Sequence, residues 1–76
     1  MFSKETFANR VKTLRKEKNI KQSELGNIVG LTHTAISDIE RGRRTTTMEK
    51  LDALANFFEV SVDYLMGRTD DPRFNK

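Results

Sequence analysis

The sequence predicts an all-α domain built from five short helices. Apolar residues recur with helical spacing in several separate stretches, helix caps or glycines stand between these stretches, and no stretch alternates as a strand would. The chain has 76 residues, with one Pro and four Gly, which suffices for one small domain with a single core. We expect the domain to span residues 1–67 and residues 68–76 to form a polar tail or linker.

The first helix is expected to end near residue 18. Phe7, Val11 and Leu14 lie at the spacing of one helical face, and Ser3 is a suitable N-cap. Residues 19–20 then interrupt the pattern, so the helix should stop there.

A second and a third helix are expected over 22–29 and about 33–41. Gly30 follows the second and suits the left-handed conformation in which many helices end. Thr32 is a good N-cap for the third. The two helices therefore form a pair joined by a three-residue turn, which is the arrangement of a helix-turn-helix over about 22–41.

Two further helices are expected over about 48–58 and 62–66. Thr46 could open the fourth helix through a capping box with Glu49, and Thr47 is the alternative cap. Ser61 is a suitable N-cap for the fifth.

The charge is distributed unevenly along the chain, and this distribution favours some functions over others. The net charge is +3, but residues 1–44 hold ten Lys or Arg and five Asp or Glu, whereas residues 45–76 hold four and six. The first part is therefore suited to binding a polyanion. The alternative is that these lysines and arginines serve only to keep the protein soluble.

Several classes of function are disfavoured. The absence of Cys excludes a disulfide scaffold, a thiolate zinc site and a cysteine nucleophile, and fits a cytoplasmic protein. The chain has a single His and neither a Gly-rich phosphate loop nor a dinucleotide fingerprint. No stretch is long and apolar enough for a membrane span. We therefore expect no enzyme activity, no metal and no cofactor.

The helix pair carries the most specific signal. Closely crossing helices need a small residue where Gly26 stands, and the turn needs a residue that tolerates positive φ where Gly30 stands. Apolar residues that would seal the angle between the two helices are Leu25, Val29, Leu31, Ile36 and Ile39.

These residues resemble the lambda-repressor-like helix-turn-helix family, also called the Cro and repressor type. The match covers roughly residues 4–67, and its most specific part is residues 31–42. There are two departures from the family pattern. The family usually has Ala at position 26, so Gly26 should cost the second helix up to about 1 kcal/mol. It usually has a capping side chain at position 21, where this chain has Lys21.

The outer face of the third helix is the candidate for reading bases. His33, Ser37 and Arg41 lie on one face, with Thr34 and Asp38 beside them. His33 could donate to a guanine acceptor, and Thr34 could hydrogen-bond or contact a thymine methyl. Asp38 could accept from cytosine, reject wrong sequences or orient Arg41. The alternative is an ordinary solvated helix surface.

Other positions are candidates for DNA backbone contacts or for structure. The resemblance implies that Gln22 faces both a phosphate and the first base-reading residue, His33, which makes Gln22 a candidate for base readout too. It also implies that Arg15 and Glu40 form a buried ion pair. Phosphate contacts are expected from exposed cations and from polar groups near helix starts. These candidates are Lys21, Gln22, Arg41, Arg43, Arg44, Thr46 and Thr47.

The sequence therefore predicts a DNA-binding transcriptional regulator, in the first place a repressor on a pseudo-palindromic double-stranded operator. One helix reads too few base pairs to be selective, so we expect a homodimer, joined near residues 57–64, on two half-sites. The resemblance adds an antirepressor protein as a candidate partner. The alternative is an antitoxin-like or accessory module that binds a partner protein on the same fold. The chain could be a complete regulator or the first domain of a longer one.

Overall fold

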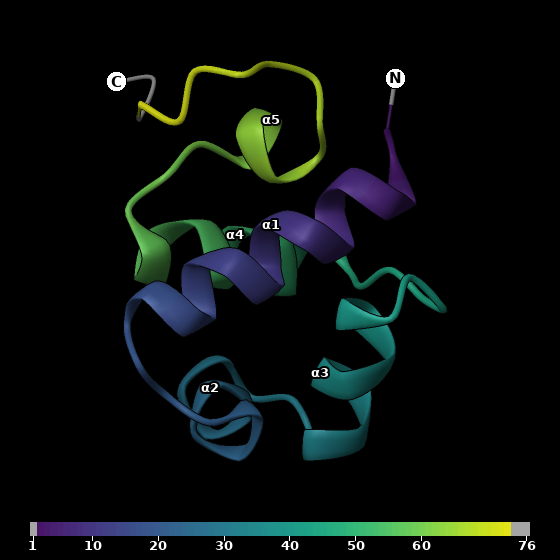
Figure 1. Ribbon diagram of the computed structural model, residues 1–76, viewed down its shortest axis with the longest axis vertical. Helices are drawn as coiled ribbons and strands as arrows, with labels where there is room; N and C mark the ends of the chain where they lie inside the picture. Colours follow the sequence, from purple (N-terminus) through teal and green to yellow (C-terminus); the bar gives the residue numbers. More distant parts are fainter. Residues whose placement is uncertain (1, 74–76) are drawn as a thin grey trace.

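The structure, a computed structural model, describes residues 2–73. It contains five helices and no strand within that range (Figure 1). Their bounds are α1 Lys4–Glu17, α2 Gln22–Val29, α3 His33–Glu40, α4 Met48–Phe58 and α5 Val62–Leu65. The all-α prediction is confirmed, and each helix begins at or next to the expected residue.

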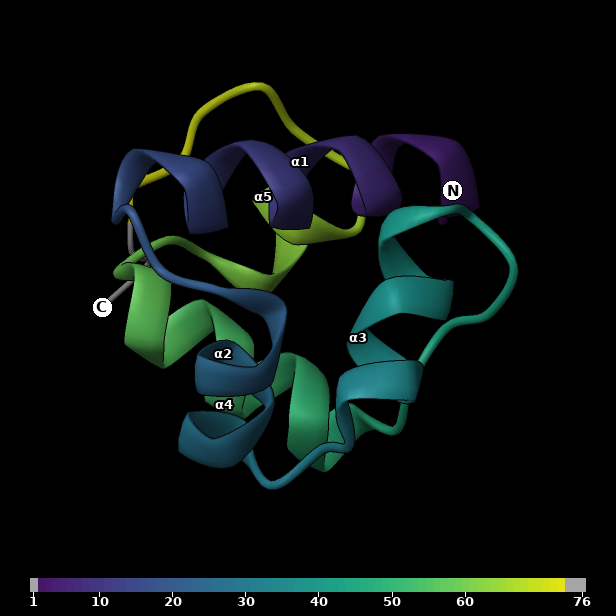
Figure 2. The same ribbon diagram turned by 60° about the horizontal axis from the view of Figure 1, so that its bottom comes forward.

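The helices are arranged around α1. In Figure 1, α1 crosses the middle of the molecule, α5 lies above it, and α2 and α3 lie below. Figure 2 shows α2 and α3 near each other, and in Figure 1 both lie at the end of the molecule opposite α5 and the segment of residues 68–73. All five helices contribute to one core, whose fully buried large side chains are Phe7, Val11, Leu25, Ile36, Ile39, Leu54 and Leu65.

Hydroxyl side chains cap four of the helices. Ser3, Thr32, Thr47 and Ser61 each accept a hydrogen bond from a backbone N–H three residues later, which satisfies one of the free donors at a helix start. Of the two caps that the sequence offered for α4, the structure has Thr47, which accepts from the Lys50 N–H, and the capping box from Thr46 to Glu49 is not formed.

Three helices end one residue earlier than expected. Lys18, Arg41 and Met66 are the C-caps of α1, α3 and α5. The break after α1 is confirmed: Asn19 has φ 58°, a left-handed conformation that Asn tolerates better than most residues. Gly30 ends α2 in the same region, with φ 77°.

The segment after α5 is tied to the domain as far as it is described. The Arg10 guanidinium, on α1, donates to the carbonyl oxygens of Tyr64 and Thr69 and pairs with Asp70 at 2.9 Å. The Ser61 N–H donates to the carbonyl of Pro72 at 3.0 Å. The expected tail or linker of residues 68–76 therefore packs against α1 and α5 over 68–73, and residues 74–76 lie outside the described residues.

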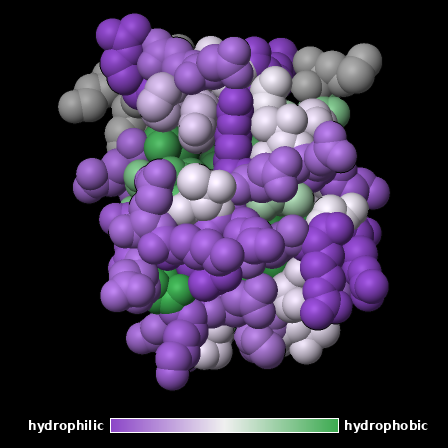
Figure 3. All heavy atoms as spheres, viewed as in Figure 1, coloured by the Kyte–Doolittle hydropathy of each residue, from purple (hydrophilic) through white to green (hydrophobic). Residues whose placement is uncertain are grey.

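The surface is mostly hydrophilic in the view of Figure 3, where apolar side chains reach the surface only in small separate patches. In the described range the exposed large apolar side chains are Ile28 and Met48. None of the helices described is long and apolar enough to cross a membrane.

Candidate nucleic-acid interface

The turn between α2 and α3 fixes how the two helices cross. The Gly26 carbonyl accepts from the Leu31 N–H at 2.8 Å. A Cβ on Gly26 would fall inside van der Waals contact with the Leu31 carbonyl oxygen, so the chain after the turn passes directly over this glycine. The prediction that position 26 must be small is confirmed, and here the requirement is for glycine.

The polar face of α3 points outward. His33 and Thr34 are exposed in its first turn, and Ser37 and Asp38 are half-buried in its second. The opposite face is buried, because Ala35, Ile36 and Ile39 join the core. Within residues 2–73 no hydrogen bond or ion pair joins Asp38 to Arg41, so the structure gives no support to the idea that Asp38 orients Arg41.

A buried ion pair ties α3 to α1, as the family resemblance implied. The Arg15 Nε donates to Glu40 Oε2 at 2.6 Å, and Arg15 Nη2 donates to Glu40 Oε1 at 3.0 Å. The two side chains are only 12% and 3% exposed. Arg15 also donates to the Ile20 carbonyl at 2.8 Å. The hydrogen bonds to Glu40 raise the pKa of Arg15, and burial acts against them.

Gln22 connects this pair to the outer face of α3. Its Nε2 donates to Glu40 Oε1 at 3.0 Å, and its Oε1 lies 3.1 Å from His33 Nε2. The contact that the resemblance implied between Gln22 and His33 is therefore present. Four side chains form one chain of hydrogen bonds, which runs from the buried Arg15 through Glu40 and Gln22 to the exposed His33.

The expected phosphate-binding residues lie at the surface around α2 and α3. Arg41, Arg43 and Arg44 are exposed at the C-terminal end of α3. Lys21 is exposed at the start of α2 and gives that helix no side-chain cap, as expected; the Glu24 carboxylate instead accepts from the Lys21 N–H at 2.7 Å. Thr46 is half-buried and Thr47 is exposed. The Thr47 oxygen serves as the cap, which leaves its hydroxyl proton free to be donated.

Two cations have positions that sequence reasoning missed. Lys50, on α4, brings its Nζ so close to Gly30 that a Cβ there would lie 2.6 Å from it. A positive charge at that place is favourable, because the C-terminus of α2 carries a partial negative charge. Arg10 is the centre of the contacts to the C-terminal segment. Local spacing could not indicate either role, since the partners are distant in the sequence.

The described residues offer no obvious metal site. Between residues 2 and 73 there is no cluster of three His, Cys, Asp or Glu side chains suited to holding a metal ion. The polar groups on the outer face of α3 are hydrogen-bond donors and acceptors, and groups of this kind recognise nucleic acids.

Comparison with known proteins identifies the family. The model of a family described as "Helix-turn-helix" matches residues 11–65. The control protein C.SmaI of Serratia marcescens is 37% identical over 86% of this chain and 77% of its own length. The uncharacterized HTH-type transcriptional regulator YobD of Bacillus subtilis is 32% identical over 87% of this chain. A crystal structure of the P22 c2 repressor in complex with a synthetic operator has a TM-score of 0.76 and 37% identity over 79% of this chain and 91% of that one.

Several relatives are longer than this chain. The matched region is 59% of YobD and 28% of the repressor protein C2 of Salmonella phage P22. The family model, by contrast, matches most of this chain, and its range includes α2, the turn and α3. The chain belongs to the helix-turn-helix family and is a helix-turn-helix domain of the Cro and repressor type.

Proposed function

We propose that the chain is a sequence-specific double-stranded DNA-binding transcriptional regulator that places α3 in the major groove of an operator. The observation that carries this proposal is the two-sided character of α3, which is buried on one face and polar and exposed on the other. A helix is about 10–12 Å across and the major groove about 12 Å wide, so an exposed helix face can reach base edges.

His33 and Thr34 are the leading candidates for base contacts. They are exposed in the first turn of α3, the part of a recognition helix that meets base edges. Ser37 and Asp38 are half-buried, so they protrude less from α3 and are weaker candidates for base contacts. Gln22 supports the reading residues from α2 through its contact with His33.

The exposed cations would position the protein on the phosphates. Arg41, Arg43 and Arg44 lie beyond the base-reading turn, where they can follow the DNA backbone without reading sequence. Lys21 and the start of α2 would also contact the backbone, and so would the hydroxyls of Thr46 and Thr47, which follow the arginines in the loop before α4.

Repression is the mode of action that we infer. A repressor occupies an operator that overlaps a promoter, and this needs only DNA binding. The operator-bound structure of the P22 c2 repressor, which is similar to this chain over most of its length, supports the choice of an operator as ligand. Binding of an antirepressor protein stays a prediction from the family resemblance.

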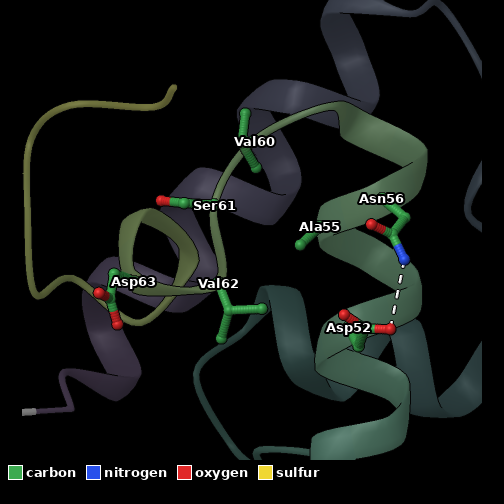
Figure 4. A pocket seen from close by; sticks show the side chains of 7 residues that line it. All are labelled: Asp52, Ala55, Asn56, Val60, Ser61, Val62 and Asp63. Carbon is green, nitrogen blue, oxygen red and sulfur yellow. Dashed lines mark hydrogen bonds between the residues drawn. The ribbon is translucent and has the colours of Figure 1, made fainter. Parts of the chain in front are cut away.

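We further infer that two copies bind one operator through the region of residues 57–64. A hollow of about 360 Å³ lies between α4 and α5, around the loop that joins them. Figure 4 shows the side chains that line it. Half-buried apolar side chains lie in this region, namely Phe57, Val62 and Tyr64. The hollow also has acidic members, Asp52 and Asp63, which suit a surface turned away from DNA. A two-fold pair would place its recognition helices about one DNA turn apart.

The alternative of a protein-interaction module would be favoured by an apolar stripe without basic residues near α3. The described residues do not have this pattern. Their two exposed large apolar side chains lie on other helices, Ile28 on α2 and Met48 on α4. Three exposed arginines lie at the end of α3. The arrangement therefore favours DNA.

The experiment is selection of bound sequences from a random pool of duplex DNA, followed by affinity measurements on the best site at several salt concentrations. We expect a pseudo-palindromic consensus and an affinity that falls steeply as salt rises. Thr34→Ala should relax the preference at one base pair in each half-site. Absence of salt-dependent binding to any duplex would overturn the proposal.

A matched pair of variants tests the phosphate contacts. Arg43→Ala should weaken specific and non-specific binding alike and lower the slope of log affinity against log salt by about one unit. Arg73→Ala removes the same charge from an exposed position in the segment after α5, which Figure 1 shows at the end of the molecule opposite α3, and should leave the slope unchanged. If the slope of log affinity against log salt is the same in both variants, Arg43 does not contact the DNA.

A further prediction from the dimer proposal is that Val62→Glu weakens binding to the full operator. The new charge would enter the hollow of Figure 4, where the side chain of Val62 is half-buried. Binding to an isolated half-site should not change, because a single copy suffices there. An unchanged affinity for the full operator would show that the copies meet elsewhere.

A further inference from the structure

The hydrogen bonds around Gln22 have a direction, and the buried ion pair sets it. Glu40, held by the Arg15 guanidinium, is a carboxylate and can only accept hydrogen bonds. The Gln22 group that faces Glu40 Oε1 at 3.0 Å must therefore be its amide NH₂. The reverse orientation would place two acceptor oxygens against each other beside a side chain that is only 3% exposed.

This orientation decides which group His33 must supply. With its NH₂ turned to Glu40, Gln22 presents its oxygen to His33 Nε2 at 3.1 Å. An amide oxygen only accepts, so the contact is a hydrogen bond only when Nε2 carries the proton. A neutral imidazole has one proton on its two nitrogens, and the hydrogen bond made by one nitrogen fixes the state of the other.

We propose that neutral His33 carries its proton on Nε2, toward Gln22, and offers a bare Nδ1 to the DNA, so that it reads a hydrogen-bond donor on a base edge. Within residues 2–73, Nδ1 makes no hydrogen bond, and the side chain is exposed in the first turn of α3. Major-groove donors are the exocyclic amines of adenine and cytosine. Donation to guanine, which the sequence alone suggested, would need the proton that Gln22 holds.

This inference rests on the proposed function for its base partner, but the proton position does not depend on DNA. Gln22 is thereby a positioning residue: it selects the form of His33 that meets the base. The network also explains why a half-buried glutamine suits position 22, because this side chain must donate to the carboxylate and accept from the imidazole at once.

The first experiment measures the proton position in the free protein by ¹⁵N NMR. His33 is the only histidine of the chain, so its ring signals are unambiguous. At a pH where these signals show the neutral ring, we expect protonated Nε2 and bare Nδ1. In Gln22→Lys the ammonium group can donate to both Glu40 and His33, so Nε2 should become the acceptor and the proton should move to Nδ1. Gln22→Arg makes the same exchange of an acceptor for a donor and serves if the lysine variant does not fold.

Two NMR results would overturn the proposal. One is a protonated Nδ1 in the parent protein. The other is the same proton position in the parent and in a folded donor variant, because residue 22 would then not control the ring.

The second experiment measures base preference at the same pH. The His33→Ala variant first identifies the base pair whose preference depends on this side chain. Operators that differ only at that pair should then show a preference of about threefold to tenfold for adenine or cytosine over guanine with the parent, the range expected for one hydrogen bond. Gln22→Lys should reverse the ratio toward guanine.

The outcomes separate this inference from the proposed function. A parent that binds no operator specifically overturns the proposed function and the base reading together, whereas the proton position is still decided by NMR. Specific binding with the same base ratio in the parent and in Gln22→Lys overturns the base reading alone.

Discussion

Replacing Glu40 by glutamine should destabilise the domain strongly in the absence of any ligand. The substitution keeps the size of the side chain but removes its charge. In the parent, one oxygen of Glu40 accepts from Arg15 Nη2 and Gln22, and the other accepts from Arg15 Nε. A glutamine has only one oxygen, so in either orientation its NH₂ faces an N–H of Arg15 at one of these short distances.

The magnitude follows from burial. The side chains of Arg15 and Glu40 are 12% and 3% exposed, so little water can replace the lost partner. Breaking a buried ion pair from one side costs about 3–5 kcal/mol. For a domain of this size, a loss of about 3 kcal/mol lowers the melting temperature by about 12–24 °C. The free energy of unfolding of a small domain can be as low as about 5 kcal/mol, so a loss of this size brings the variant close to unfolding at room temperature.

The assay is thermal unfolding followed by circular dichroism, with chemical denaturation to obtain the free energy of unfolding. The matched control is Arg68→Gln, which removes one partner of the Arg68–Asp63 pair; these side chains are 55% and 62% exposed and 3.9 Å apart. Exposed pairs contribute about 0–1 kcal/mol, so this variant should melt close to the parent. A Glu40→Gln protein that melts within a few degrees of the parent would refute the reasoning. The double variant Arg15→Met, Glu40→Leu should be more stable than Glu40→Gln, since it leaves no buried charge unpaired.

Three further predictions concern other parts of the domain. Gly26→Ala should lower the free energy of unfolding. Overpacking against the Leu31 carbonyl costs about 1–3 kcal/mol, which outweighs the gain of about 1 kcal/mol in helix propensity that alanine brings. A variant that is more stable than the parent in denaturant unfolding would contradict this. Arg10→Gln should release the segment after α5, seen as faster amide hydrogen exchange over 68–73 and not in α3. Hydrogen bonds from Arg73 lower the pKa of Asp71 to about 2, so Arg73→Gln should raise it in an NMR titration. The lowered pKa means that the pair stabilises the folded state above the ordinary carboxyl range and that this effect is lost as the pH falls through about 2, but both groups are exposed and the melting temperature at neutral pH should not change.

Sequence reasoning predicted the features that depend on neighbouring residues. Ser3, Thr32 and Ser61 cap the helices that follow them because a cap needs only a hydroxyl and an N–H three residues later. The choice between Thr46 and Thr47 could not be made in this way, since both are threonines and α4 can begin at either register. The structure decides for Thr47.

Features that depend on residues far apart in the sequence could not be predicted from local patterns. The Arg15–Glu40 pair was expected only from the family resemblance, because its partners are 25 residues apart. The partners of Arg10 lie more than 50 residues away, and nothing in the sequence of α1 distinguishes this half-buried arginine from the exposed cations of the same helix. The orientation of the Gln22 amide also requires coordinates, since it is set by a carboxylate on another helix.

The chain of hydrogen bonds from Arg15 to His33 leads to a last prediction, that a buried residue affects base preference. Glu40 is 3% exposed and cannot touch DNA, yet its lone pairs hold the Gln22 NH₂ and thereby turn the Gln22 oxygen to His33. A glutamine at position 40 presents an NH₂ as well as an oxygen, so either orientation of Gln22 can then find a partner.

Both proton positions of His33 should therefore be populated in Glu40→Gln, and the ratio of affinities for operators that differ at the His33-dependent base pair should approach one. The measurement is made at low temperature, where circular dichroism shows the variant folded, so that lost stability does not enter the ratio. If the folded variant keeps the base ratio of the parent, the carboxylate acts on stability alone and Gln22 is held in its orientation by something other than Glu40.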